Sequence, residues 1–219
     1  MKFFLKIVLF LSVFSPAFGQ IEPRHTFTIE LGMPVPMANR VFKGMMKSIV
    51  SVSPYYQFRL KNSIAFGAGF NYTYLQIDKF KVPTSEPASG GLQSGGVFLK
   101  LSHEKFHTEQ FATDLGVKVG YSQTYFNTNY NDSLYGKALK VNSISITPTL
   151  GLILSVDEFS SYRFTLGYAF QGYGFSPQRL GIKTNAGYDP SQFSKLTQYL
   201  IFGFGFTHYF SGKEESIQQ

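Results

Sequence analysis

The sequence lacks cysteine and tryptophan, and only 15% of its 219 residues are charged. Without cysteine the chain can form no disulfide and can carry no lipid attached to a cysteine. Beyond the first twenty residues, no apolar run approaches the ~20 residues that a membrane-spanning helix needs. These absences leave two classes open: a soluble β domain, and a barrel that crosses a membrane with strands.

The N-terminal segment has the organisation of a secretory signal peptide. Lys2 and Lys6 precede and flank an apolar stretch at residues 7–14, and an alanine and a glycine stand three places and one place before Gln20. The apolar stretch is too short for an uncleaved anchor. We therefore expect residues 1–19 to be removed and the mature chain to begin at Gln20.

Aromatic residues and glycine are abundant, with 24 Phe, 14 Tyr and 21 Gly, while the mean hydropathy is only −0.04. A membrane barrel has this profile because its apolar residues occupy every second position. The alternation is clearest in residues 197–210. One face there carries Leu200, Phe202, Phe204, Phe206, His208 and Phe210, and the other carries Tyr199, Ile201, Gly203, Gly205 and Thr207.

Seven further segments alternate in the same way: residues 26–33, 50–60, 64–74, 97–102, 111–125, 143–154 and 162–171. The pattern predicts an all-β fold, an eight-stranded antiparallel up-and-down transmembrane β-barrel at residues 20–210. Short connections alternate with long ones, as periplasmic turns alternate with extracellular loops. Both ends of the barrel domain should then be periplasmic, with residues 211–219 as a short periplasmic tail.

A soluble barrel or sandwich would turn its apolar face inward and its second face to water. Here the second face is poor in charge and rich in Gly, Ser and Thr, which suits the crowded interior of an eight-stranded barrel better than a solvent surface. We therefore favour the membrane barrel.

With a signal segment ending in Ala17-Phe18-Gly19 before Gln20, eight alternating strands and an aromatic final strand closing at Phe210, the chain resembles the small outer-membrane β-barrel proteins of Bacteroidota. More loosely, it resembles the OmpA transmembrane domain and OmpX-like proteins. The resemblance implies an integral outer-membrane protein. It departs from OmpA-like proteins because no peptidoglycan-binding domain follows the last strand, and from their usual terminal signal because nine residues follow Phe210.

Six charged residues fall on the inward face, mostly near the short connections: Glu30, Arg59, Lys100, Asp114, Lys118 and Arg163. Charges that leave water are tolerated when they are paired, so we predict an ionic network in the lumen. The network could be a structural plug, or a gate or anion path that uses the excess of cations. We favour the plug because the interior of such a barrel has room for side chains and little else.

An enzyme is not expected. Some eight-stranded barrels that the chain resembles deacylate or acylate lipid A, and the resemblance implies that they need a histidine near the extracellular side. All four histidines, His25, His103, His107 and His208, map to the periplasmic end instead. No base remains at the outer rim for such a mechanism. We expect no cofactor and no metal, because His103 and His107 have no third ligand nearby.

The long loops carry cations and aromatic residues that form a candidate binding surface: Arg40, Lys43, Phe175, Arg179, Lys183 and Tyr188. Removing Lys2 and Lys6 lowers the net charge from +7 to +5, and this excess would face anionic lipopolysaccharide. The attraction could be generic, without a specific ligand. Nucleic acid is excluded as a partner because the cations form no contiguous stripe.

The sequence thus predicts a non-enzymatic outer-membrane scaffold whose loops bind surface ligands or partner proteins. Its expected partners are outer-membrane lipid, lipopolysaccharide, the barrel assembly machinery during biogenesis, and a protein bound through the loops. The alternatives are a narrow conduit for ions or a small apolar molecule, as in OmpW-like barrels, and an accessory component of a secretion machine.

Overall fold

The computed structural model describes residues 24–60, 62–78, 89–108, 110–157, 159–182 and 184–210. Eight antiparallel strands follow one another around a closed barrel, and β1 pairs with β8 to complete it. The strands are β1 (Arg24–Met37), β2 (Met46–Arg59), β3 (Ile64–Ile77), β4 (Gly90–Phe106), β5 (Phe111–Thr128), β6 (Leu139–Ser155), β7 (Ser160–Gln171) and β8 (Thr197–Phe210). The predicted fold class is confirmed.

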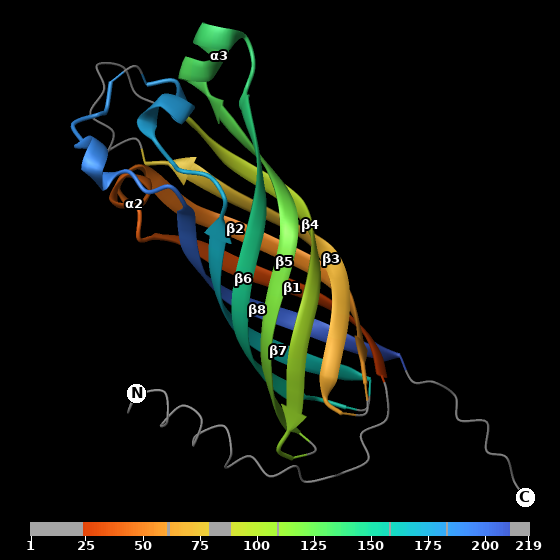
Figure 1. Cartoon of the computed structure of the whole chain (residues 1–219). Helices are drawn as coiled ribbons and strands as arrows, with labels where there is room; N and C mark the ends of the chain where they lie inside the picture. The colour runs from red at the N-terminus through yellow and green to blue at the C-terminus, as the bar shows by residue number, and fades with distance from the viewer. Residues whose placement is uncertain are drawn as a thin grey trace, which may run out of the picture.

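The two ends of the barrel differ (Figure 1). One end, the short-turn end, holds the tight connections and the beginning of β1 and end of β8. The other, the long-loop end, carries two short helices and two 3-10 turns: α2 (Arg40–Met45), α3 (Asn129–Tyr135), η1 (Pro177–Leu180) and η2 (Pro190–Gln192). The proposed signal segment and tail, residues 1–19 and 211–219, lie outside the described residues.

Most strands extend beyond the predicted segments, and β4 differs most. The alternation predicts a strand at residues 97–102, whereas β4 begins at Gly90 and ends at Phe106. Glycines at its start carry no side chain and therefore no alternation signal. The prolines and glycines of residues 83–91 predict an exposed hairpin tip; this stretch is largely outside the described residues, and its Gly90 and Gly91 belong to the strand.

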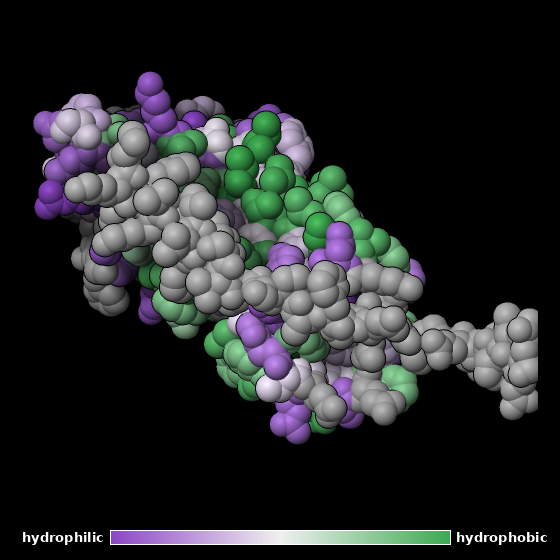
Figure 2. Space-filling model, turned by 60° about the horizontal axis from the view of Figure 1, so that its bottom comes forward, coloured by the Kyte–Doolittle hydropathy of each residue, from purple (hydrophilic) through white to green (hydrophobic). Residues whose placement is uncertain are grey.

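Side chains along each strand alternate between the outer surface of the barrel and its lumen. On β8, Phe202, Phe204 and Phe206 are exposed, whereas Thr207 and Tyr209 are buried inside. Hydrophobic residues gather over the barrel wall, and hydrophilic residues gather at the long-loop end (Figure 2). A wall of exposed apolar side chains this continuous is stable in lipid and costly in water.

No helix in the described part of the chain is long and apolar enough to cross a membrane.

The lumen is filled by a row of alternating large and small residues. Tyr55 on β2 faces Gly69 on β3, which faces Phe98 on β4, which faces Gly120 on β5. A Cβ on Gly69 would lie 2.4 Å from Cβ of Tyr55, and one on Gly120 would lie 2.9 Å from Cβ of Phe98. The two aromatic rings meet edge to face, 6.1 Å apart, across the space that the glycines leave.

Replacing Leu99 by Arg tests which solvent the wall faces. Leu99 lies on the outer face of β4 and is 69% exposed. A lipid-facing Leu99 predicts that Leu99→Arg lowers the free energy of unfolding by about 2–4 kcal/mol, measured by urea unfolding in lipid vesicles. The control Asn127→Arg, beyond the apolar band on β5, should cost about 1 kcal/mol or less. Equal, small effects of the two substitutions would contradict a lipid-facing wall.

Candidate functional site

Seven charged side chains meet inside the barrel and form what we call the lumen ion cluster: Glu30, Arg59, Lys100, Glu104, Asp114, Lys118 and Arg163. They come from β1, β2, β4, β5 and β7, all from inward positions. The six lumen residues predicted from the sequence lie together here, and Glu104 joins them.

Arg163 is the centre of this cluster. Its Nη2 atom donates to Oε1 of Glu104 at 2.6 Å, and its Nη1 atom donates to Oδ2 of Asp114. The same Asp114 oxygen accepts from Nζ of Lys100 at 2.7 Å. On the other side, Nη1 of Arg59 lies 3.8 Å from Oε2 of Glu104, and its guanidinium stacks over Phe106. Two carboxylates thus hold three cations.

Glu30 and Lys118 form the second part of the lumen ion cluster. Nζ of Lys118 donates to Oε2 of Glu30 at 2.6 Å, and the hydroxyl of Tyr55 donates to Oε1 of Glu30 at 2.9 Å. Tyr55 also accepts from Nζ of Lys100 at 3.3 Å. The Tyr55 hydroxyl therefore links the two parts into one network.

The lumen network predicted from the sequence does not include Glu104, because the alternation ends its fourth segment at residue 102 and leaves residue 104 in the connection to the next segment. Glu104 is 1% exposed and accepts from Gln57 as well as from Arg163. The available signal was parity, since Glu104 continues the inward series of Lys100 and Ser102.

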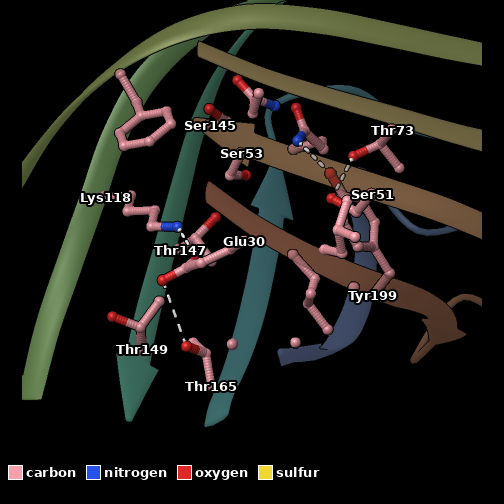
Figure 3. A pocket seen from close by; sticks show the side chains of 18 residues that line it. Glu30, Ser51, Ser53, Thr73, Lys118, Ser145, Thr147, Thr149, Thr165 and Tyr199 are labelled. Atoms are coloured by element: carbon pink, nitrogen blue, oxygen red, sulfur yellow. Dashed lines mark hydrogen bonds and ion pairs between the residues drawn. The ribbon is translucent and has the colours of Figure 1, made fainter. Parts of the chain in front are cut away.

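A cavity of about 40 Å³ lies further along the lumen, toward the long loops (Figure 3). We call it the hydroxyl chamber, because its polar lining is mostly hydroxyl groups. These belong to Ser51, Ser53, Thr73, Ser145, Thr147, Thr149, Thr165 and Tyr199. Glu30 and Lys118 form part of the same lining, so the chamber directly adjoins the lumen ion cluster.

The long-loop end of the lumen is closed by an apolar cluster that we call the loop cap. Its centre contains Phe42 of α2, Phe126 of β5 and Phe175 of the last loop, each fully buried. The Phe42 and Phe175 rings are 5.0 Å apart. Burial of this kind stabilises by roughly 1.5–3 kcal/mol for each large side chain, which fixes the loops over the barrel mouth.

Hydrogen bonds hold the loop cap in register. Nδ2 of Asn131 in α3 donates to the carbonyl oxygens of Phe126 and Arg179, and the Thr128 hydroxyl donates to that of Leu180. In the same cap, burial raises the pKa of the Tyr173 hydroxyl well above its usual value. The last loop is therefore a folded part of the molecule.

The predicted loop residues divide between the surface and the loop cap. Arg40 and Lys43 are exposed on α2, whereas Phe175 is buried. The Arg179 guanidinium lies 5.6 Å from the Tyr173 ring. Lys183 lies outside the described residues. Tyr188 is partly buried, and its hydroxyl lies where a side chain on residue 44 would stand.

The surface of the long-loop end is basic. Its described cations are Arg40, Lys43, Lys47, Lys137, Lys140, Arg179 and Lys195, and its described acids are Asp78, Asp132 and Asp189. Seven cations less three acids leave +4 at this end. Asp189 caps η2, and its hydrogen bonds with Ser191 lower the pKa of the carboxyl.

All four histidines lie at the short-turn end, on β1, β4, β8 and the turn that follows β4. The described residues contain no group of three or more His, Asp or Glu side chains that could hold a metal ion.

No protein-family model and no curated protein matches the chain. Its fold is similar to those of solved structures that include the following three. Neisserial surface protein A has a TM-score of 0.55 at 11% identity, over 87% of this chain and 100% of that one. OprG from Pseudomonas aeruginosa has a TM-score of 0.56 at 11% identity, over 89% of this chain and 99% of that one. Ail of Yersinia pestis, in complex with the heparin analogue sucrose octasulfate, has a TM-score of 0.52 at 10% identity, over 87% of this chain and 100% of that one. The fold is that of the small eight-stranded outer-membrane barrels.

Removing the central cation tests how much the barrel depends on the lumen ion cluster. Arg163→Met keeps the volume but leaves Glu104 and Asp114 with less compensation in a buried site. We expect the free energy of unfolding to fall by about 3–5 kcal/mol, measured by urea unfolding. The control Lys140→Met removes an exposed cation and should change it by about 0.5 kcal/mol or less. A loss as small as that of the control would contradict a structural role for the cluster.

Proposed function

We propose that this protein is a non-enzymatic integral outer-membrane protein whose filled barrel is a rigid scaffold for a basic binding surface at its extracellular end. One observation carries the proposal: the lumen ion cluster, the Tyr55 and Phe98 layer and the loop cap occupy the interior in succession. A barrel filled in this way leaves its ordered long-loop surface as the part available to a partner.

Several features support the outer-membrane location and the orientation. The fold matches outer-membrane barrels, and the exterior is apolar. Short turns and long loops occupy opposite ends, as they do in barrels whose loops face outward. The signal segment expected at residues 1–19 agrees with export.

The chemistry of the surface favours anionic ligands. Its described residues carry +4, and Arg40 and Lys43 lie one turn apart on α2, which its contacts with the loop cap hold in place. Ail, which has the same fold, was crystallised with a heparin analogue. We propose that this surface binds phosphate or sulfate groups of surface polysaccharide, including the lipopolysaccharide around the barrel. A protein partner bound through the loops would need an acidic face.

Charge removal on α2 tests the binding surface. Arg40→Gln with Lys43→Gln removes two positive charges, and we expect the affinity for immobilised heparin at low salt to fall roughly tenfold, by about 0.7 kcal/mol for each charge. The protein would be held in nanodiscs, and binding measured by surface plasmon resonance at two salt concentrations.

The matched control changes the net charge by the same −2 at the opposite end, because Asn62→Asp and Gln110→Glu add two negative charges on the short turns. Its affinity for heparin should remain that of the wild type. Equal losses in both variants would mean that net charge alone determines the binding, and the α2 surface would lose its role.

A second candidate function is a narrow conduit with a side opening, and interruptions in the strand pairing favour it. Pairing between β6 and β7 is interrupted at Thr147 and Pro148, and pairing between β2 and β3 at Ser53 and Pro54. Proline has no N–H to donate to a neighbouring strand. Thr147 and Ser53 both line the hydroxyl chamber, so the two interruptions in pairing adjoin that cavity.

Single-channel recording in a planar bilayer separates the two functions. A filled scaffold predicts no discrete openings for the wild type, and higher conductance when Arg59→Ala and Arg163→Ala remove cations from the lumen ion cluster. A conduit lined by these cations predicts wild-type openings with anion preference and lower conductance in the double variant. Wild-type openings with lower conductance in the double variant would overturn the scaffold hypothesis.

A further inference from the structure

The outer face of β4, β5 and β6 changes character toward the long-loop end. Val97, Tyr121 and Ile144 form the last apolar row across these three strands. In the next two outward rows every residue except Tyr125 is polar or glycine: Gly95, Gln123, Asn142, Gln93 and Lys140. The three strands therefore continue beyond the apolar band with a mostly polar outer face, and α3 stands above them (Figure 1).

A groove of about 240 Å³ lies on this outer face, over Gly90 and Gly91 at the start of β4, and we call it the wall groove. Neither glycine has room for a side chain. A Cβ on Gly90 would lie 2.1 Å from the carbonyl oxygen of Asn127, and one on Gly91 would lie 2.5 Å from that of Leu75. Gly90 also has a φ of +113°, which side chains rarely allow. The floor of the wall groove is therefore bare backbone.

An aromatic ring and two amides form the sides of the wall groove. Tyr74 on β3 lies along one side, with its Cε2 atom 2.8 Å from the position of a Cβ on Gly91. Gln93 on β4 and Asn127 on β5 also line the groove, and neither side chain has a hydrogen-bond partner within the described part of the chain. Each side-chain amide therefore offers two N–H donors and an oxygen acceptor to a ligand.

The base of α3 completes the lining with Asn129 and Asp132. The backbone N–H of Ser89 donates to Oδ1 of Asn129 at 2.9 Å, and the backbone N–H of Asn129 donates to the Ser89 carbonyl oxygen at 3.2 Å. These hydrogen bonds hold the beginning of α3 against β4. Among the described lining residues Asp132 carries the one charge, and it is negative. A carboxylate accepts from hydroxyl groups and repels phosphate and sulfate.

We propose that the wall groove binds one neutral sugar residue of a glycan. The C–H groups of a sugar ring pack against an aromatic ring such as that of Tyr74, while its hydroxyls donate to and accept from the amides of Gln93 and Asn127. The groove is smaller than the roughly 300–1,000 Å³ of pockets that enclose a drug-sized ligand, so it suits a single ring. The site is separate from the basic surface of α2, and only its exposure outside the cell rests on the proposed function.

Two sources can supply such a sugar. The wall groove lies just beyond the apolar band, where the headgroups of the surrounding membrane begin, so the sugar can belong to lipopolysaccharide. It can also belong to a soluble polysaccharide. Both sources present the same hydroxyl chemistry to the groove.

Saturation-transfer NMR tests the site. The protein would be held in phospholipid nanodiscs, with the methyl glycosides of glucose, galactose and mannose as probes. We expect transfer to the ring protons of a bound probe, because these protons would contact Tyr74. The 6-phosphate of the same sugar should compete less well than the sugar itself, because of Asp132. No transfer to any of the three probes, or better competition by the phosphate, overturns the proposal.

A matched pair of glutamine variants locates the binding. Gln93→Leu removes one amide from the wall groove at nearly constant volume and should weaken the affinity for the bound probe roughly fivefold. The control Gln198→Leu removes the same group from the outer face of β8, where it accepts from Tyr168 on the opposite side of the barrel, and should leave the affinity unchanged. An equal loss in both variants, or a loss in neither, overturns the assignment to the groove.

Filling the groove gives an independent check. Asn127→Trp places a large side chain in the wall groove and should abolish probe binding, and binding that persists overturns the proposal. Heparin binding is measured on the same nanodiscs and should be unchanged, which shows that the long-loop end is still folded. Failure of the sugar site and failure of the α2 surface therefore give different results.

Nanodiscs that contain lipopolysaccharide separate the two sources. If lipopolysaccharide supplies the sugar, its headgroups occupy the wall groove, and the probe signal falls in these nanodiscs but remains in phospholipid alone. Equal signals in both kinds of nanodisc assign the groove to a soluble glycan. Either result supports the sugar site and identifies its source.

Discussion

The narrow interior of an eight-stranded barrel is the constraint on which the rest of this structure depends. Such a lumen has room for side chains but not for bulk water, so every inward residue must fit its neighbours and find its partners within the wall. The row of Tyr55, Gly69, Phe98 and Gly120 solves the problem of volume. The lumen ion cluster compensates the buried charges, because Arg163 on β7 forms ion pairs with carboxylates on two other strands, β4 and β5.

Ion pairs inside a barrel are not a source of large net stability, since desolvation offsets most of the attraction. Their effect is on specificity. A shift of one strand by one residue would turn Arg163 or Asp114 toward lipid, at a cost of several kcal/mol. The cluster joins β1, β2, β4, β5 and β7, so it ties the register of strands that do not pair directly. This coupling suits a scaffold that must present its loops in one arrangement.

Alternation predicts most of this wall because the outer face is uniformly apolar and the period of a strand is two. The same parity brings Asp114 and Arg163 together before any distance is known. It fails where side chains are absent, as at Gly90 and Gly91 of β4, and it underestimates the strand that carries Glu104. It also gives no information on Phe175, because the contacts of a loop residue are set by the barrel mouth that it covers and have no period.

The loop cap also determines the character of the outer surface. Phe42 and Phe175 lie in segments that a strand-based reading assigns to exposed loops, where aromatic side chains would be available for binding. The barrel mouth offers these loops an apolar environment outside the membrane, and Phe42 and Phe175 fold into it, whereas Tyr135 of α3 stays exposed. The charged side chains of Arg40, Lys43 and Lys140 remain exposed on the outer surface. The basic surface and the closed lumen are thus two results of the same folding of the loops, and a change that opened one would disturb the other.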